Sequence, residues 1–134
     1  MDADALQELT AALPAGVVLT DADGMEKYRH DWSKDSGAGT PVAAVRAEDA
    51  GHVQAAVRWA AQHRVPVVPR GAGSGLSGGS SAVDGGIVVS LERMRAIEID
   101  TDCQVAVVEP GAFNAEVKAA AAEHGLWYPP DPSS

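Results

Sequence analysis

Apolar residues recur along the chain in two patterns, one with helical spacing and one in short unbroken runs. Helical spacing predicts a helix over residues 2–12, ended by Pro14, and a longer amphipathic helix over residues 49–63. A third helix is expected to have Asn114 as its N-cap and to end just before Gly125. On the second helix, the stripe expected to be buried consists of Val53, Ala56, Val57, Ala60 and Ala61.

The short apolar runs predict strands. "PVAAVR" (41–46) and "VPVVPR" (65–70) flank the second helix as buried strands, so the three elements form a βαβ unit with parallel strands. Three further strands follow, "GIVVSL" (86–91), "AIEID" (96–100) and "QVAVVEP" (104–110). The polar segment "DTDC" suits a hairpin turn, so the last two should pair antiparallel. The fold class is therefore α+β, a small parallel unit followed by a partly antiparallel sheet with packed helices.

A glycine-rich segment, "RGAGSGLSGGSSAVDGG", joins two of the predicted strands. Its G-x-G-x-x-G at Gly73, Gly75 and Gly78 suggests a Rossmann dinucleotide site, which needs a helix that begins inside the motif. The residues after Gly78, "GSSAVDGG", would not form that helix, and no Gly-Lys-Ser/Thr closes a Walker loop. Both of these phosphate-binding motifs are therefore excluded.

Two interpretations of the segment remain, a flexible linker and a nest of backbone amides that binds anionic oxygens. Glycine permits the positive φ angles of such a nest and lets a diphosphate touch the backbone. Arg70 at the start of the segment, and its place directly between two strands, favour the nest. The hydroxyls of Ser74 and Ser77 would add donors.

Composition excludes some classes of binding partner. The net charge of −9 over 134 residues excludes a typical nucleic-acid or anionic-membrane surface. Cys103 is the only cysteine, the N-terminus is acidic, and no long apolar run occurs, so we expect a cytoplasmic protein without a membrane span. The four histidines have no ligand spacing, so no metal site is expected. Trp59 and Trp127 are expected to pack against other side chains and not to serve as stacking platforms for a ligand.

Three segments in this order, "PVVPRGAGSGLSGG", "GGIVVSLERM" and "AVVEPGAFNAEVKAAAAEHGLWYPPDPSS", resemble the FAD-linked oxidase family. That family has a PCMH-type FAD-binding domain, also called the vanillyl-alcohol oxidase type. Within it, the resemblance is to the branch of the glycolate oxidase D-subunit and D-lactate dehydrogenase, over about residues 28–134. The resemblance implies a helical lead-in over residues 1–40 and the first part of the FAD-binding domain over residues 41–134.

The resemblance also implies two cofactor-binding segments. The first wraps the FAD pyrophosphate through main-chain amides and would consist of Arg70, Gly71, Ala72, Gly73, Ser74, Gly75, Leu76 and Ser77. The second approaches the flavin from the other side, or is a proline-rich tail without a ligand, and would consist of Pro130, Asp131, Pro132 and Ser133. Some relatives attach the flavin covalently through a histidine in the first segment. This chain has Ser74 in that region, so noncovalent FAD is expected.

The activity that the resemblance implies is oxidation of a 2-hydroxy acid, such as glycolate or D-lactate, by hydride transfer to FAD. Relatives continue with a second glycine-rich segment and a substrate domain, so we expect an N-terminal fragment without identifiable catalytic residues and inactive alone. Two alternatives remain, a non-catalytic nucleotide-binding or subunit-interaction module and an oxidase of a sugar lactone or alditol. A homodimer or an electron-acceptor partner is also expected.

Overall fold

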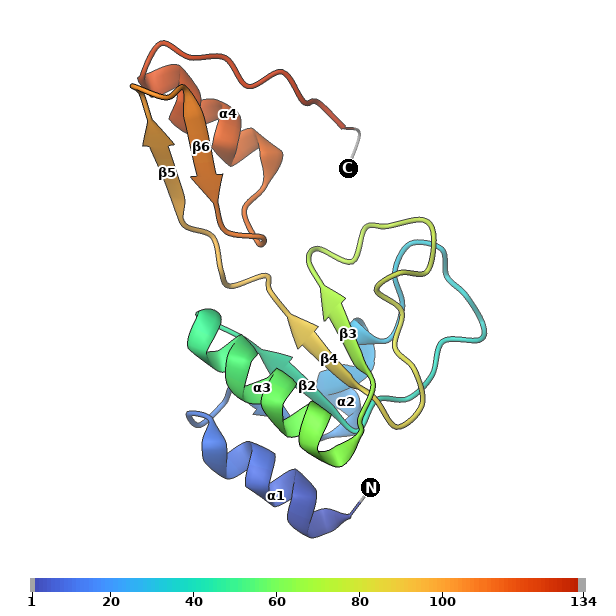
Figure 1. Ribbon diagram of the computed structural model, residues 1–134. Coiled ribbons are helices and arrows are strands. Elements are labelled where there is room, and N and C mark those ends of the chain that lie inside the picture. Colours follow the sequence, from blue (N-terminus) through green and yellow to red (C-terminus); the bar gives the residue numbers. More distant parts are fainter. Residues whose placement is uncertain (1, 133–134) are drawn as a thin grey trace. The chain divides into compact units, whose positions relative to one another are not determined.

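The computed structural model describes residues 2–132 and divides into two compact units, with the boundary between Arg93 and Met94 (Figure 1). The first unit contains α1 (Ala3–Ala12), β1 (Val18–Leu19), α2 (Ala22–Met25), the 3-10 helix η1 (Glu26–Tyr28), β2 (Ala43–Arg46), α3 (Ala50–His63), β3 (Val67–Arg70) and β4 (Ile87–Ser90). The second contains β5 (Ile97–Asp100), β6 (Val105–Val108) and α4 (Asn114–Glu123). The division at residue 40 into a lead-in and an FAD-binding domain stays a prediction.

The first unit is built on a four-stranded sheet in the order β1-β2-β4-β3. β1 is antiparallel to β2, and the other neighbours are parallel. β4 lies between the two strands of the predicted βαβ unit, since its Ile87 pairs with Ala43 of β2 and with Val67 of β3. The α+β fold class is confirmed, and β4 proves to be the central strand of the parallel part.

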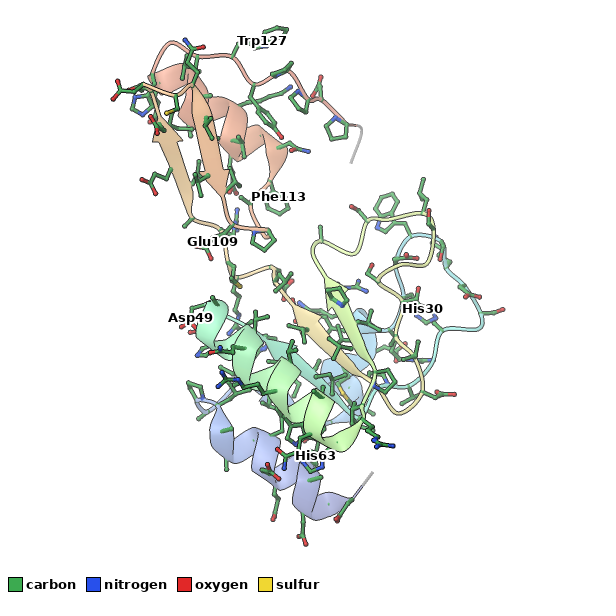
Figure 2. The ribbon with its side chains drawn as sticks, in the orientation of Figure 1. His30, Asp49, His63, Glu109, Phe113 and Trp127 are labelled. Atoms are coloured by element: carbon green, nitrogen blue, oxygen red, sulfur yellow. The ribbon has the colours of Figure 1, made fainter. Side chains whose placement is uncertain are left out.

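Helices cover both faces of this sheet (Figure 1). On the side of α2, a buried cluster combines that helix, η1, the sheet and the end of the glycine-rich segment, through Met25, Tyr28, Ala44, Ala82 and Val88. On the other side lies α3, capped by Asp49 (labelled in Figure 2), whose Oδ1 accepts from the amide of His52 at 2.9 Å. The glycine-rich segment is thus anchored in the core at Ala82.

The prediction of a buried strand over residues 65–70 is wrong at three positions, since Pro66, just before β3, is exposed and two residues of the strand itself are exposed as well. Val67 and Pro69 are exposed, whereas Val68 and Arg70 are buried. β3 is the edge strand of its sheet, so its side chains alternate between a covered and an open face. An edge also accommodates Pro69, which has no amide hydrogen for a further neighbour.

The buried face of α3 also differs from the predicted stripe. Ala56 and Ala60 are buried, but Val57 is 45% exposed. The buried face centres instead on Trp59, as its predicted packing role requires, and its Nε1 donates to the carbonyl of Ala5 at 2.7 Å. An indole buries a larger area than a valine and needs a partner for its N–H, so it turns the helix toward α1. Ala61 is also exposed.

In the second unit, β5 and β6 pair antiparallel as predicted, with Ile97 opposite Val108. Asp100 accepts from two turn amides and so closes the predicted hairpin. The prediction of Asn114 as N-cap is wrong, because Phe113 occupies that position without a side-chain cap. Gly125, with φ +71°, follows the end of α4 as predicted. None of the helices among residues 2–132 has the length and apolar character needed to cross a membrane.

Candidate cofactor site

The glycine loop, defined as residues 71–86, leaves the carboxyl end of β3 and returns to the start of β4 (Figure 1). It contains turns and bends but no helix, so the exclusion of a Rossmann site is confirmed for this loop. Gly73 and Gly78 have φ angles of +71° and +79°. These left-handed conformations favour glycine and bend the backbone as an amide nest requires.

The first half of the loop has unused main-chain donors. Across residues 2–132, no backbone or side-chain oxygen accepts a hydrogen bond from any amide of residues 71–77. In the same stretch, the carbonyl of Gly75 accepts a hydrogen bond from the amide of Trp32 at 2.9 Å, so a residue outside the loop holds this part of the loop backbone. Consecutive free amides on a tethered backbone are suited to bind the oxygens of a diphosphate.

Arg70 braces the loop from inside. The residue is only 9% exposed, and its Nη1 donates to the carbonyls of His30 at 2.8 Å and Ser80 at 3.4 Å. Its guanidinium lies directly under Gly73, because a Cβ on Gly73 would collide with Nη2. Arg70 therefore holds the loop through backbone carbonyls, and a direct contact between Arg70 and a cofactor stays a prediction.

Opposing effects act on the charge of the Arg70 guanidinium. Burial lowers the pKa of its guanidinium, and the negative charges of Asp31 and Glu92 oppose that effect. The guanidinium also lies 5.9 Å from the centre of the Tyr28 ring, within the range of a cation–π contact. These surroundings keep a positive charge beneath the loop, where it favours an anionic ligand.

Asp31 is a functional candidate that the sequence analysis missed. It is 3% exposed, and its Oδ1 accepts from the amide of Ser33 at 2.9 Å. The Ser33 hydroxyl and the amides of Ser33, Gly78 and Ser80 lower the pKa of Asp31 against the effect of burial. A carboxylate in the stretch "HDWS" was the only signal in the sequence.

The remaining predicted residues of the loop differ in exposure. Gly71 and Ser74 are half-buried, and Leu76 and Ser77 are exposed with Ala72. Over residues 2–132, the hydroxyls of Ser74 and Ser77 form no hydrogen bond to protein. They are free to act as the additional donors that the sequence predicts, and that role stays a prediction.

The second predicted segment belongs to the second unit. Pro130, Asp131 and Pro132 are exposed, and Ser133 lies outside the described residues. The carboxylate of Asp131 pairs with Lys118 Nζ at 2.8 Å, and this contact lowers its pKa. Their contact with a flavin stays a prediction. Trp127, labelled in Figure 2, is 83% exposed in this unit, so the expected packing against other side chains is not found here.

One hollow of the first unit lies along α1, away from the glycine loop. It has a volume of about 500 Å³ and is lined by Ala3, Leu6, Gln7, Thr10, Ala11 and Thr20. These side chains include no titratable group, so the hollow offers no acid–base chemistry. No group of three His, Cys, Asp or Glu side chains suited to a metal ion occurs in the described part of the chain.

A tethered loop with free amides between two parallel strands, with no helix at its start, differs from a Rossmann dinucleotide site. Comparison with known proteins identifies the family. Residues 41–134 match the FAD binding domain family, and the chain belongs to this family of FAD-linked oxidoreductases with a PCMH-type fold.

Three relatives illustrate the match. D-2-hydroxyglutarate dehydrogenase of Stutzerimonas stutzeri is 40% identical over 127 residues, which are 94% of this chain and 27% of that protein. Glycolate oxidase subunit GlcD of Bacillus subtilis is 38% identical over 95 residues, 70% of this chain and 20% of that protein. The structure of alkyldihydroxyacetonephosphate synthase shares the fold, with a TM-score of 0.84 at 18% identity over 98% of this chain and 28% of that one. The chain thus spans about a quarter of the length of these proteins.

Proposed function

We propose that the glycine loop binds the diphosphate of noncovalently held FAD in an oxidoreductase that acts on a 2-hydroxy acid. The observation that supports this most is the row of free amides at residues 71–77. The loop contains no lysine or arginine between Gly71 and Gly86. Main-chain donors and the buried Arg70 must therefore supply the attraction for the anion.

FAD, when bound, supplies the hydride acceptor for the substrate. The residues of this chain hold the diphosphate: the amides donate to its oxygens, and Gly73 and Gly75 present no side chain that would block its approach. Ser74 is a hydroxyl at the place where some relatives carry a histidine, which supports the noncovalent mode. The catalytic residues stay unassigned.

The substrate class follows from the relatives. Proteins similar to this chain are named D-2-hydroxyglutarate dehydrogenase, glycolate oxidase subunit and D-lactate dehydrogenase, and all three names refer to 2-hydroxy acids. We extend this class to the enzyme in which the chain acts. A homodimer, an electron-acceptor partner and a cytoplasmic location are further proposals, of which the last is supported only by the single cysteine.

Binding is tested by titrating the purified chain with FAD, ADP and riboflavin and following flavin fluorescence or heat. FAD and ADP should bind and riboflavin should not, because only the first two carry a diphosphate. Flavin released into solution by acid precipitation would support noncovalent attachment. Equal affinity for FAD and riboflavin, or no binding of either diphosphate ligand, would contradict the proposal.

The substrate is tested by adding candidates without oxygen to the flavin-loaded protein and recording flavin absorbance. Bleaching by glycolate, D-lactate or D-2-hydroxyglutarate is the expected result. Bleaching only by a sugar lactone or an alditol would overturn the substrate class. FAD binding without bleaching by any candidate would favour the non-catalytic binding module.

A further inference from the structure

A short segment of bends and turns, Arg29–Ser33, lies against the glycine loop. The carbonyl of Arg29 accepts from the amide of Ala82 at 2.8 Å, and the amide of Trp32 donates to Gly75 at 2.9 Å. The amide of Asp31 also points to the hydroxyl of Ser81 at 3.4 Å. Residues some 40 to 50 positions apart in the sequence therefore hold both halves of the loop.

Arg70 joins the same segment from the other direction, because it donates to the carbonyl of His30, the residue labelled in Figure 2. Its second acceptor is the carbonyl of Ser80, within the loop. The guanidinium thus connects β3, the segment Arg29–Ser33 and the second half of the loop. A change in the position of this segment would shift the loop with it.

Asp31 is the buried charge of the segment. Its Oδ2 has no hydrogen-bond partner of good geometry within residues 2–132 and would stand 3.7 Å from a Cβ on Gly75. The amides of Gly78 and Ser80 lie close enough to stabilise the carboxylate. A buried anion is costly unless N–H groups and positive charge surround it, and here the loop and Arg70 provide both.

The loop amides therefore fall into two groups. Those near Asp31, at Gly78 and Ser80, face a carboxylate of the protein, whereas those of residues 71–77 have no acceptor in the described chain. The carboxylate thus lies beside the amides of the second half of the loop, and those of the first half stay available to an external anion.

We propose that Asp31 is a positioning residue for the glycine loop, which fixes its second half so that the amides of residues 71–77 stay arranged for a diphosphate. Asp31 does not touch the ligand in this proposal; it acts through the loop backbone. The part that concerns the diphosphate rests on the proposed function, whereas the part that concerns loop order is independent of it.

Loop order is tested by amide hydrogen exchange on the unliganded chain, for the wild type, Asp31→Ala and Asp31→Asn. In Asp31→Ala, exchange at Trp32, Ser81 and Ala82 should rise about tenfold. The amides of Trp32 and Ala82 form hydrogen bonds between the segment and the loop, and the amide of Ser81 donates to Gly78 within the loop. Amides of the central strand β4 should keep their rates. Asp31→Asn, which retains one acceptor oxygen, should give a smaller rise.

The matched control is Asp35→Ala, because Asp35 lies in the same connection but is exposed, and its carboxylate accepts only from the nearby amide of Gly37, at 2.8 Å, within residues 2–132. This variant should leave the exchange rates at Trp32, Ser81 and Ala82 unchanged. Unchanged rates in Asp31→Ala, or an equal rise across β4 as well, would overturn the proposal, since the second result means general destabilisation.

FAD titration of the same variants separates the two proposals. Asp31→Ala should weaken FAD binding about tenfold, as loss of a charge-assisted contact would. Asp31→Asn should weaken it less, and Asp35→Ala should keep the wild-type affinity. Wild-type affinity in Asp31→Ala would overturn the positioning role. If the wild type binds no FAD while Asp31→Ala still loosens the loop, the proposed function fails and the positioning of the loop by Asp31 stands.

Discussion

Gly73 is the residue at which the loop tolerates least change. Its φ is +71°, and a Cβ there would collide with the guanidinium of Arg70. Gly73→Ala should lower the free energy of unfolding by about 1–3 kcal/mol, through strain in the left-handed region and displacement of Arg70. Urea denaturation followed by circular dichroism measures this loss.

Gly79 provides the control, because a Cβ there would meet nothing within 4 Å and its φ is not in the left-handed region. Gly79→Ala should change stability by less than about 1 kcal/mol. An equal loss for the two variants would show that glycine is required throughout the loop and not by the contact between Gly73 and Arg70.

A second residue-scale prediction concerns pH. The buried Tyr28 donates from its hydroxyl to Glu92 Oε1 at 2.7 Å. Partial burial raises the pKa of Glu92, but the hydrogen bond from Tyr28 and the Lys27 ammonium outweigh burial, so the pKa lies below its ordinary value of 4.5. A lowered carboxyl pKa stabilises the fold above pH 4.5, and this stabilisation is lost as the pH falls through the folded value.

Tyr28→Phe should therefore cost about 1–2 kcal/mol at pH 7, and less at pH 3. Urea unfolding at the two values measures the difference. Tyr128→Phe is the control, since Tyr128 contacts the neutral Asn114 and its small cost should not follow the ionisation of a carboxylate. A cost of Tyr28→Phe that is the same at both values would contradict the role of the Glu92 charge.

At the scale of residues, the sequence predicts some parts of the site and misses others. Glycines and Arg70 are adjacent in the chain, so the loop and its start could be recognised from composition and turn chemistry. Asp31 could not, because its role arises from contacts with Gly75, Gly78 and Ser80 across a long stretch of chain. Nor could the orientation of Arg70, which the packing of His30 and Ser80 around it decides.

At the scale of elements, α1 is attached to α3 through Trp59. Its Nε1 donates to the carbonyl of Ala5 at 2.7 Å, and both residues are buried. Trp59→Phe removes the donor and some of the buried area, and it should lower the free energy of unfolding by about 1–3 kcal/mol. Circular dichroism during urea unfolding measures it, independently of the lost indole fluorescence.

Trp32→Phe is the control for Trp59→Phe, because the Trp32 side chain is mostly exposed. Its cost should stay below about 0.5 kcal/mol. If Trp59→Phe were as mild as Trp32→Phe, the attachment of α1 to α3 would not depend on the indole.

Elements whose pattern is local were predicted well. The helices over residues 2–12 and 49–63 and the hairpin at "DTDC" depend on neighbours in the chain, and they appear as α1, α3 and the β5–β6 turn. The place of β4 was not predicted, since strand pairing is decided by packing between distant segments. The burial of β3 was overestimated for the same reason: its sequence does not show that it is an edge strand.

At the scale of the whole molecule, the net charge has the same sign as the ligand proposed for the site. The chain carries a net charge of −9, yet its candidate site is for an anion. Local amides and one buried guanidinium can outweigh a distant negative surface, because their fields act at short range without intervening water. The family match over residues 41–134 agrees with this assignment, and the share of each relative that the chain covers leaves the substrate-binding part of the enzyme as a proposal.

The most direct test of the central claim is a titration of the isotope-labelled chain with ADP, followed by amide chemical shifts in two-dimensional NMR spectra. The account predicts saturable shifts at the amides of residues 71–77, and none there with adenosine, which lacks the diphosphate. Shifts confined to the hollow along α1, or equal shifts with ADP and adenosine, would contradict the assignment of the glycine loop as the diphosphate site.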